Sequence, residues 1–241
     1  MDKIYILGSG AMANSMAKGL ENSGFKVVLV SRQKLENSSY ENELYNEIYD
    51  ITDKNVILAF KPYALSDVAL KLKGVAKCVL SVLARTDLDT IKNALNAHKY
   101  AICMPNLAAS HNASITPFMG DLELENIING FGSSVFVSSK AEFDAAGVIS
   151  GCAPAFLALV AEALANGVVL GGVKAKDANK LVSGVFLGTA KLLEDLHPAI
   201  FKERVCSPAG TTIEGVAKLE EMGIRSAFIQ AVKASIDKQK G

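Results

Sequence analysis

The sequence predicts an α/β fold, with a doubly wound sheet in its first half and an all-helical second half. Short apolar runs alternate with segments of helical spacing up to about residue 140, and no strand-like run follows. The runs are continuously apolar, which indicates parallel strands that helices cover on both faces. We therefore expect two domains, over residues 1–145 and 146–241.

Each element has its own pattern. KIYIL (3–7) is the first expected strand, and residues 10–24 are expected to form a helix because their apolar residues recur at helical spacing. Further strands are expected at 26–30, 55–60, 76–83 and 99–104, with helices near 64–73 and 87–97. In the second half, helices are expected near 141–171, 175–195 and 212–238.

Composition excludes several classes of function. The 25 basic and 25 acidic residues cancel and are scattered, which gives no electrostatic argument for a nucleic-acid or membrane partner. The cysteines stand alone and the three histidines lack metal-ligand spacing, so we expect no metal site. These residues are Cys78, Cys103, Cys152, Cys206, His98, His111 and His197. Reduced thiols and the lack of a signal-like N-terminus favour a cytoplasmic protein.

One stretch, residues 145–173, is long enough to span a membrane and carries a single charge, Glu162. It is rich in alanine and glycine rather than in leucine and isoleucine, and it contains Pro154. A helix buried in a protein interface explains this composition better than a membrane span. Oligomerisation is one use of such a surface, although close packing within one chain would give the same pattern.

A glycine motif follows the first expected strand and opens the first expected helix. LGSGAMA places Gly8, Gly10 and Ala13 in the G-x-G-x-x-A spacing of a Rossmann dinucleotide-binding turn. Gly8 permits the tight turn, Gly10 lets the backbone approach a pyrophosphate, and Ala13 lets the helix pack closely on the strand. The first domain is therefore expected to bind a nicotinamide dinucleotide.

The end of the second expected strand selects the nucleotide. NAD-specific sites have an acid there, whereas this chain has Ser31, Arg32, Gln33 and Lys34. A hydroxyl and two cations suit a 2′-phosphate, so we expect NADP(H), with NAD(H) as a further cofactor. Solvated loop charges are the alternative interpretation of Arg32 and Lys34.

Near the C-terminus, VCSPAGTTIEG (205–215) forms a stiff polar turn. Thr211 followed by Glu214 fits a capping box, and Gly210 allows a close approach. The free N–H groups and positive dipole end of a helix start can bind an anion. A purely structural cap is the alternative.

Several segments, in the same order along nearly the whole chain, resemble pyrroline-5-carboxylate reductase, the last enzyme of proline biosynthesis. They are LGSGAMA, AFKP (59–62), MPN (104–106), SGCAPAF (150–156), HP (197–198) and SPAGTTI (207–213). The resemblance implies an N-terminal Rossmann domain and a C-terminal helical domain that forms a homodimer or higher oligomer. It implies NADPH-dependent hydride transfer to C5 of the cyclic imine 1-pyrroline-5-carboxylate, which gives L-proline.

The resemblance also assigns residues. Thr212 is the implied catalytic residue, which hydrogen-bonds the ring nitrogen while Thr211 caps the helix. With the motif residues above, the expected cofactor-binding residues are Leu7, Gly8, Ser9, Gly10, Ala11, Met12, Ala13, Ser31, Arg32, Phe60, Lys61, Pro62, Ala84 and Asn106. The expected substrate-binding residues are Ser207, Ala209, Gly210, Thr211 and Thr212.

The chain also departs from the family pattern. Arg85, Asn112, Ser114 and Ala209 stand where the family has glycine, and residues 107–114 differ most. Two alternatives therefore stay open: a related imine or hydroxyacid reductase, and a non-catalytic NADP-binding regulatory protein. The absence of a lysine or histidine between residues 150 and 173 counts against a hydroxyacid enzyme.

Overall fold

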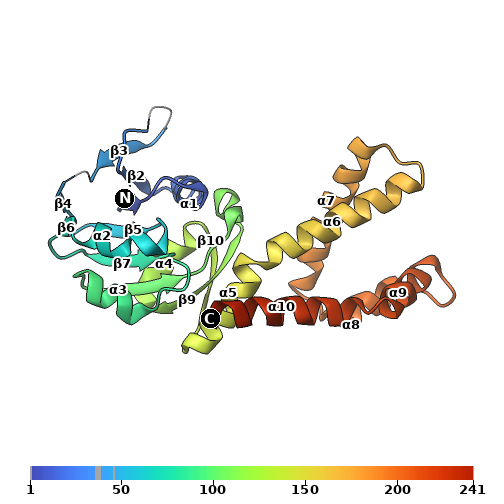
Figure 1. The fold of residues 1–241 in the computed structure, drawn as a ribbon. Helices are drawn as coiled ribbons and strands as arrows, with labels where there is room; N and C mark the ends of the chain where they lie inside the picture. Colours follow the sequence, from blue (N-terminus) through green and yellow to red (C-terminus); the bar gives the residue numbers. More distant parts are fainter. Residues whose placement is uncertain (1, 36–38, 46, 241) are drawn as a thin grey trace. The chain divides into compact units, whose positions relative to one another are not determined.

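The computed structural model describes residues 2–35, 39–45 and 47–240, and its contacts divide the chain into two compact units (Figure 1). The units are Met1–Gly151 and Cys152–Gly241, whereas we expected a boundary after residue 145. The helix α5 (Lys140–Gly151) explains the difference, because it packs on strand β9 (Ser114–Gly120) of the first unit and buries Phe143 there.

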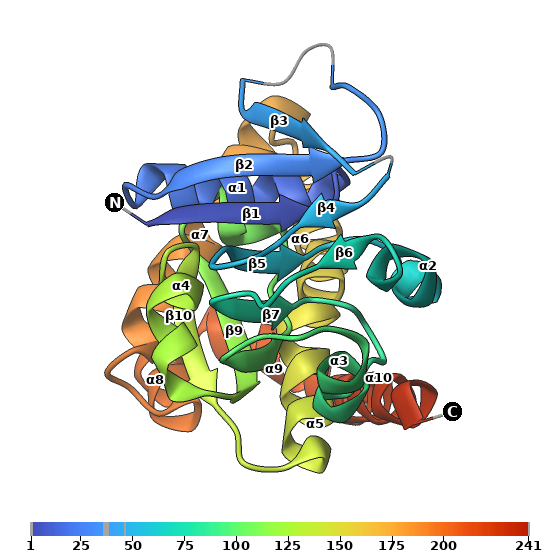
Figure 2. The same cartoon turned by 90° about the vertical axis from the view of Figure 1, so that its left-hand side faces the viewer.

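The first unit is a doubly wound Rossmann sheet, as the sequence predicts. Eight strands lie in the order β10-β9-β8-β7-β5-β1-β2-β3, and Figure 2 shows the sheet with helices on both of its faces. The strands are β1 (Lys3–Leu7), β2 (Lys26–Ser31), β3 (Glu41–Leu44), β5 (Asn55–Leu58), β7 (Cys78–Ser81), β8 (Tyr100–Cys103), β9 and β10 (Gly132–Phe136). A separate pair joins β4 (Tyr49–Asp50) to β6 (Leu72–Lys73).

Burial on both faces explains the continuous apolar strands. Ile6 of β1 belongs to one core cluster with Leu20 of α1 (Ala11–Asn22) and Ile128 of α4 (Glu125–Asn129). Leu7, the next residue, belongs to the other cluster with Ile91 of α3 (Leu88–Ala94). Because successive strand residues face opposite sides, both of these apolar residues are buried. The helix α2 (Leu65–Ala69) also contributes to the second cluster.

The observed sheet is mixed rather than wholly parallel, because β9 runs antiparallel to β8. The sequence did not indicate β3, β9 or β10, which contain glycine, serine, glutamate and a proline that strands disfavour. The helices expected near 64–73 and 87–97 are shorter in the structure. Short 3₁₀ turns join the elements: η1 (Pro62–Ala64), η2 (Leu107–His111) and η3 (Leu122–Leu124).

The second unit is all helical, which confirms the expectation for this half of the chain. Its helices are α6 (Ala153–Leu170), α7 (Ala175–Leu193), α8 (Pro198–Val205), α9 (Thr211–Glu221) and α10 (Ile224–Lys240). Two expected helices are each divided in two. Pro154 in the first turn of α6 separates it from α5, and Gly223, with a φ of 72°, separates α9 from α10.

Candidate cofactor and substrate sites

The turn after β1 requires glycine at its first position. Gly8 has a φ of 138°, and a Cβ atom placed on it would lie 2.3 Å from the carbonyl oxygen of Ala59. Any side chain there would collide with the backbone that follows β5. Gly8 thus sets the direction in which the chain leaves the strand and enters α1.

Gly10 occupies the N-cap position of α1, and a Cβ atom on it would meet nothing within 4 Å. The side-chain amide of Asn14 donates to the carbonyl oxygens of Ser9 and Gly10, at 2.9 and 3.0 Å, which stabilises the turn. The first turn of α1 contains no acidic residue. Its free N–H groups and dipole therefore favour a phosphate above Gly10.

A cavity of about 570 Å³ opens at this turn. It is lined by Gly8, Ser9, Gly10, Ala11, Met12, Ser31, Arg32, Tyr45, Ala59, Phe60, Lys61, Pro62, Val82, Ala84, Met104 and Leu107. All these residues belong to the first unit. The cavity lies at the carboxyl ends of β1, β2, β5 and β7, where open α/β sheets bind ligands.

The cavity has a cationic side. Arg32 and Lys61 are exposed and line both this cavity and a smaller one of about 230 Å³. Ser31 is buried, and its hydroxyl donates to the carbonyl oxygen of Gln33 at 2.6 Å and accepts from Asn42 Nδ2 at 2.9 Å. These bonds shape the backbone from which Arg32 extends. A phosphate is the ligand that these two cations favour.

The turn before α9 differs from the expected capping box. Helix α9 begins at Thr211, and its N-cap is Gly210, which has no side chain to cap the helix. The expectation that the Thr211 side chain caps α9 is therefore wrong. Ser207 shapes the turn instead, since its carbonyl oxygen accepts from Gly210 N at 3.1 Å. Without a side-chain cap, the first N–H groups of α9 are available to an anion.

Two sequence comparisons identify the relatives of this fold. Residues 140–241 match the family model described as pyrroline-5-carboxylate reductase dimerisation, and residues 3–85 match the model described as NADP oxidoreductase coenzyme F420-dependent. A pyrroline-5-carboxylate reductase of Helicobacter pylori strain J99 is 35% identical, and the alignment covers 100% of both chains. This chain belongs to the pyrroline-5-carboxylate reductase family.

Solved structures of the family have the same fold. The 1-pyrroline-5-carboxylate reductase of Streptococcus pyogenes has a TM-score of 0.82 and 26% identity, and the match covers 99% of this chain and 98% of that one. A Plasmodium falciparum pyrroline carboxylate reductase with NADP bound has a TM-score of 0.84, with 21% identity over 99% of this chain and 97% of that one.

Most of the cofactor-binding residues expected from the family resemblance line this one cavity, but three of them do not. Leu7 and Ala13 are fully buried in the core, where they support the turn from behind. The side chain of Asn106 binds backbone instead: its Oδ1 accepts from Ala108 N at 2.9 Å, and its Nδ2 donates to Ser150 O at 3.1 Å.

Sequence reasoning missed five lining residues, Tyr45, Ala59, Val82, Met104 and Leu107. Ala59 and Met104 stand inside the AFKP and MPN segments, so these motifs could have indicated them. Leu107 directly follows MPN. No sequence pattern indicated Tyr45, because it follows strand β3, which the sequence did not predict.

Proposed function

We propose that this chain reduces 1-pyrroline-5-carboxylate to L-proline with NADPH, in the cytoplasm. The observation that carries the proposal is the full-length relation to a pyrroline-5-carboxylate reductase, with the LGSGAMA turn and the SPAGTT turn both present. The turn leaves room for a dinucleotide, because there is open space at Gly10, where a side chain would obstruct a pyrophosphate.

The residues at the cavity have distinct roles in binding. The N-terminus of α1, beyond Gly10, binds the pyrophosphate, and Arg32 and Lys61 favour the 2′-phosphate of NADPH. Val82 and Met104, at the ends of β7 and β8, form an apolar wall for the nicotinamide half. Bound NADPH supplies the hydride, and the protein orients it and excludes water.

The SPAGTT turn binds the substrate in this proposal. The N–H groups at the start of α9 hold the substrate carboxylate, and the Thr212 hydroxyl orients the ring nitrogen. The glycine cap leaves both threonine side chains out of the capping role. The choice of Thr212 as the catalytic residue rests on the family resemblance.

The helical unit supports a homodimer or a higher oligomer. Among its described residues, the buried apolar side chains are those of Ala165, Ala178 and Val182, which is too small a core for five helices. Many large apolar residues are exposed, among them Leu159, Leu170, Leu181, Val185, Leu187, Leu219, Met222 and Ile229. A second copy of the unit would cover them.

A membrane is a weaker explanation of the same surface. By length and composition, the helical stretch Lys140–Leu170 could cross a membrane, since an 18-residue window within it has a mean hydropathy of 1.9. Its first part is α5, which buries Phe143 and Val148 against the sheet of the first unit. A membrane span would require α5 to leave that core.

The oligomer has a direct test. Leu187→Glu in α7 should give a species of lower mass in light scattering, because it places a charge in the proposed interface. Leu122→Glu, at an exposed leucine of the first unit, is the matched control and should leave the mass unchanged. Equal masses for wild type and Leu187→Glu would contradict the interface.

The activity is tested by the loss of NADPH absorbance with purified protein and pyrroline-5-carboxylate, with NADH in parallel. We expect turnover with NADPH that falls at least about a hundredfold in Thr212→Ala, and is largely retained in Thr212→Ser. Thr211→Ala is the matched control and should have a smaller effect. Folded protein that binds NADPH but oxidises none would overturn the proposal.

A further inference from the structure

The chain that joins β2 to β5 has an unusual form, because its described residues contain no helix. Instead, β3 pairs with β2 as the edge strand, and Tyr45 extends the ladder by donating its N–H to the carbonyl oxygen of Ser31 at 3.2 Å. Tyr45 is only 5% exposed, and it lines both the larger and the smaller cavity. Tyr45 is therefore a largely buried residue in the wall of the candidate cofactor site.

The position of Tyr45 relates it to one half of the cofactor. It lies beside Ser31 and Arg32, at the end of β2, where dinucleotide-binding folds hold the adenosine ribose. Burial raises the pKa of the Tyr45 phenol, and the positive charge of Arg32 opposes part of that rise. Val82 and Met104 line the nicotinamide side, at the ends of other strands.

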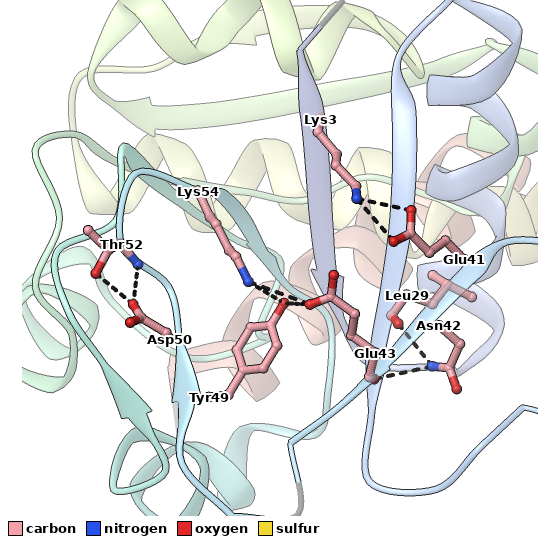
Figure 3. Close-up of polar contacts among 9 residues, drawn as sticks. All are labelled: Lys3, Leu29, Glu41, Asn42, Glu43, Tyr49, Asp50, Thr52 and Lys54. Atoms are coloured by element: carbon pink, nitrogen blue, oxygen red, sulfur yellow. Dashed lines mark hydrogen bonds and ion pairs between the residues drawn. The ribbon is translucent and has the colours of Figure 1, made fainter.

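A partly buried polar cluster fixes the chain on both sides of Tyr45, and Figure 3 shows its three members, Glu43, Tyr49 and Lys54. Tyr49 Oη donates to Glu43 Oε2 at 2.5 Å and accepts from Lys54 Nζ at 2.9 Å. The Lys54 ammonium also lies 3.5 Å from Glu43 Oε2 and 4.1 Å from the centre of the Tyr49 ring.

The environment makes this cluster stronger than a surface ion pair. The side chains of Lys54 and Glu43 are 23% and 32% exposed, and Tyr49 is 7% exposed. Burial, reinforced by the Glu43 carboxylate, raises the pKa of the Tyr49 phenol, so it remains a neutral donor. The Lys54 ammonium also lies 4.5 Å from the centre of the Tyr5 ring on β1. The cluster thus anchors the β3–β4 segment to strand β1.

We propose that Tyr45 binds the adenosine half of the cofactor and determines affinity for it, and that the Glu43–Tyr49–Lys54 cluster is a positioning device for Tyr45. Glu43 is two residues before Tyr45 and therefore on the same side of the strand, and Tyr49 holds the chain beyond it. The cluster replaces the support that a packed helix would give. This inference rests on the proposed NADPH-dependent function.

The first test measures binding without turnover. NADPH and adenosine 2′,5′-bisphosphate, which contains only the adenosine half, are titrated by calorimetry against wild type, Tyr45→Phe and Tyr45→Ala. We expect Tyr45→Ala to weaken both ligands by the same factor, about tenfold, because an aromatic contact with the base is lost. Tyr45→Phe, which retains the ring, should remain within about threefold of wild type.

The second test is a double-mutant cycle for the positioning role. Tyr49→Phe removes the hydroxyl that joins Glu43 to Lys54, and should weaken NADPH binding about threefold in the wild-type background. In the Tyr45→Ala background it should have no further effect. Glu41→Gln is the matched control, because it breaks the exposed pair of Glu41 with Lys3, which also joins β3 to β1, and it should leave NADPH affinity unchanged.

The outcomes separate this inference from the proposed function. Wild type that binds no NADPH would reject the cofactor assignment, and the inference with it. Wild type that binds NADPH, with a folded Tyr45→Ala that binds it equally well, would reject the inference alone. If Tyr49→Phe weakens binding equally in both backgrounds, the cluster acts on the cofactor by a route other than Tyr45. Tyr45→Leu, which retains most of the volume, replaces Tyr45→Ala if that variant fails to fold.

Discussion

The side-chain amide of Asn106 donates a hydrogen bond to the carbonyl oxygen of Ser150, 44 residues further along the chain, at 3.1 Å. The hydroxyl of Ser150 lies 2.5 Å from the carbonyl oxygen of Met104, so the two residues hold the end of β8 against α5. Met104 lines the candidate cofactor cavity. Asn106, expected from the family resemblance to line the cofactor site, therefore supports its wall.

Replacing Asn106 tests this supporting role. Asn106→Ala removes the bond to Ser150 and the cap on Ala108 N, and we expect it to lower the free energy of unfolding by about 1–2 kcal/mol. Asn93→Ala, at an exposed asparagine of α3, should change it by less than about 0.5 kcal/mol. The measurement is urea unfolding at a fixed protein concentration. Equal losses for the two variants would contradict the role assigned to Asn106.

Alanine substitutions at the two glycines of the turn, Gly8 and Gly10, should have different effects. Gly8→Ala places a Cβ atom 2.3 Å from Ala59 O, so we expect a poorly folded protein with a lowered melting temperature. Gly10→Ala meets nothing within 4 Å, so it should melt like wild type. It should nevertheless weaken NADPH binding at least about tenfold, because its methyl group enters the space for the pyrophosphate. Calorimetric NADPH titration of Gly10→Ala decides the second point, and unchanged affinity would contradict it.

Among the strands, those that the sequence predicted have two buried faces. The strands β1, β2, β5 and β7 could be recognised because most residues of a strand between two helical layers are buried and apolar. The edge strands could not. In β10, for example, Val135 and Phe136 are exposed, and the strand opens with Gly132, whose φ is 153°. Such a strand is specified by its partner rather than by its own propensity.

The site shows the same division between local and tertiary signals. The G-x-G turn was readable because its constraints lie within six residues of chain. The position of Tyr45 depends on a ladder with β2 and on packing in the core cluster that also contains Tyr49, which no local pattern encodes. At the start of α9, the pattern Thr211 to Glu214 indicated a capping box, yet the helix begins one residue earlier than such a cap requires. The sequence pattern predicted the helix but not its N-cap residue, because the extended backbone of Gly210 provides the cap conformation.

The N-terminus of α3 gives a prediction for pH. Hydrogen bonds from the Thr90 side chain and backbone hold the pKa of Asp87 below its ordinary value, and its carboxylate accepts from Thr90 N at 2.8 Å. A lowered pKa in the folded state contributes stability above the unfolded pKa, which is lost as the pH falls through the folded pKa.

Between about pH 5 and pH 3, wild type should therefore lose more stability than Asp87→Asn, which can cap the helix without titrating. The difference should be less than about 1 kcal/mol, because the carboxylate is well exposed and solvent screens it. Urea unfolding of both proteins across this range provides the measurement. Parallel pH profiles would show that Asp87 does not contribute.

The last prediction concerns backbone conformation beside the cofactor cavity. Arg85, which follows the lining residue Ala84, has a φ of 59°, and Ala209 in the SPAGTT turn has a φ of 55°. The left-handed region is unfavourable for residues with a Cβ atom, and the family resemblance implies glycine at both positions. Arg85 and Ala209 therefore adopt the backbone conformation that glycine favours, and their Cβ atoms make it strained.

Arg85→Gly should relieve that strain. We expect the free energy of unfolding to rise by about 0.5–1 kcal/mol, after allowing for the greater freedom of glycine in the unfolded chain. Arg85→Ala is the matched control: it removes the same exposed side chain but retains the Cβ atom, so it should leave stability within about 0.5 kcal/mol of wild type. Arg85→Asn should fall between the two, because asparagine tolerates this conformation. If Arg85→Ala stabilises the protein as much as Arg85→Gly, the unfavourable element is the arginine side chain itself, and the backbone explanation is wrong.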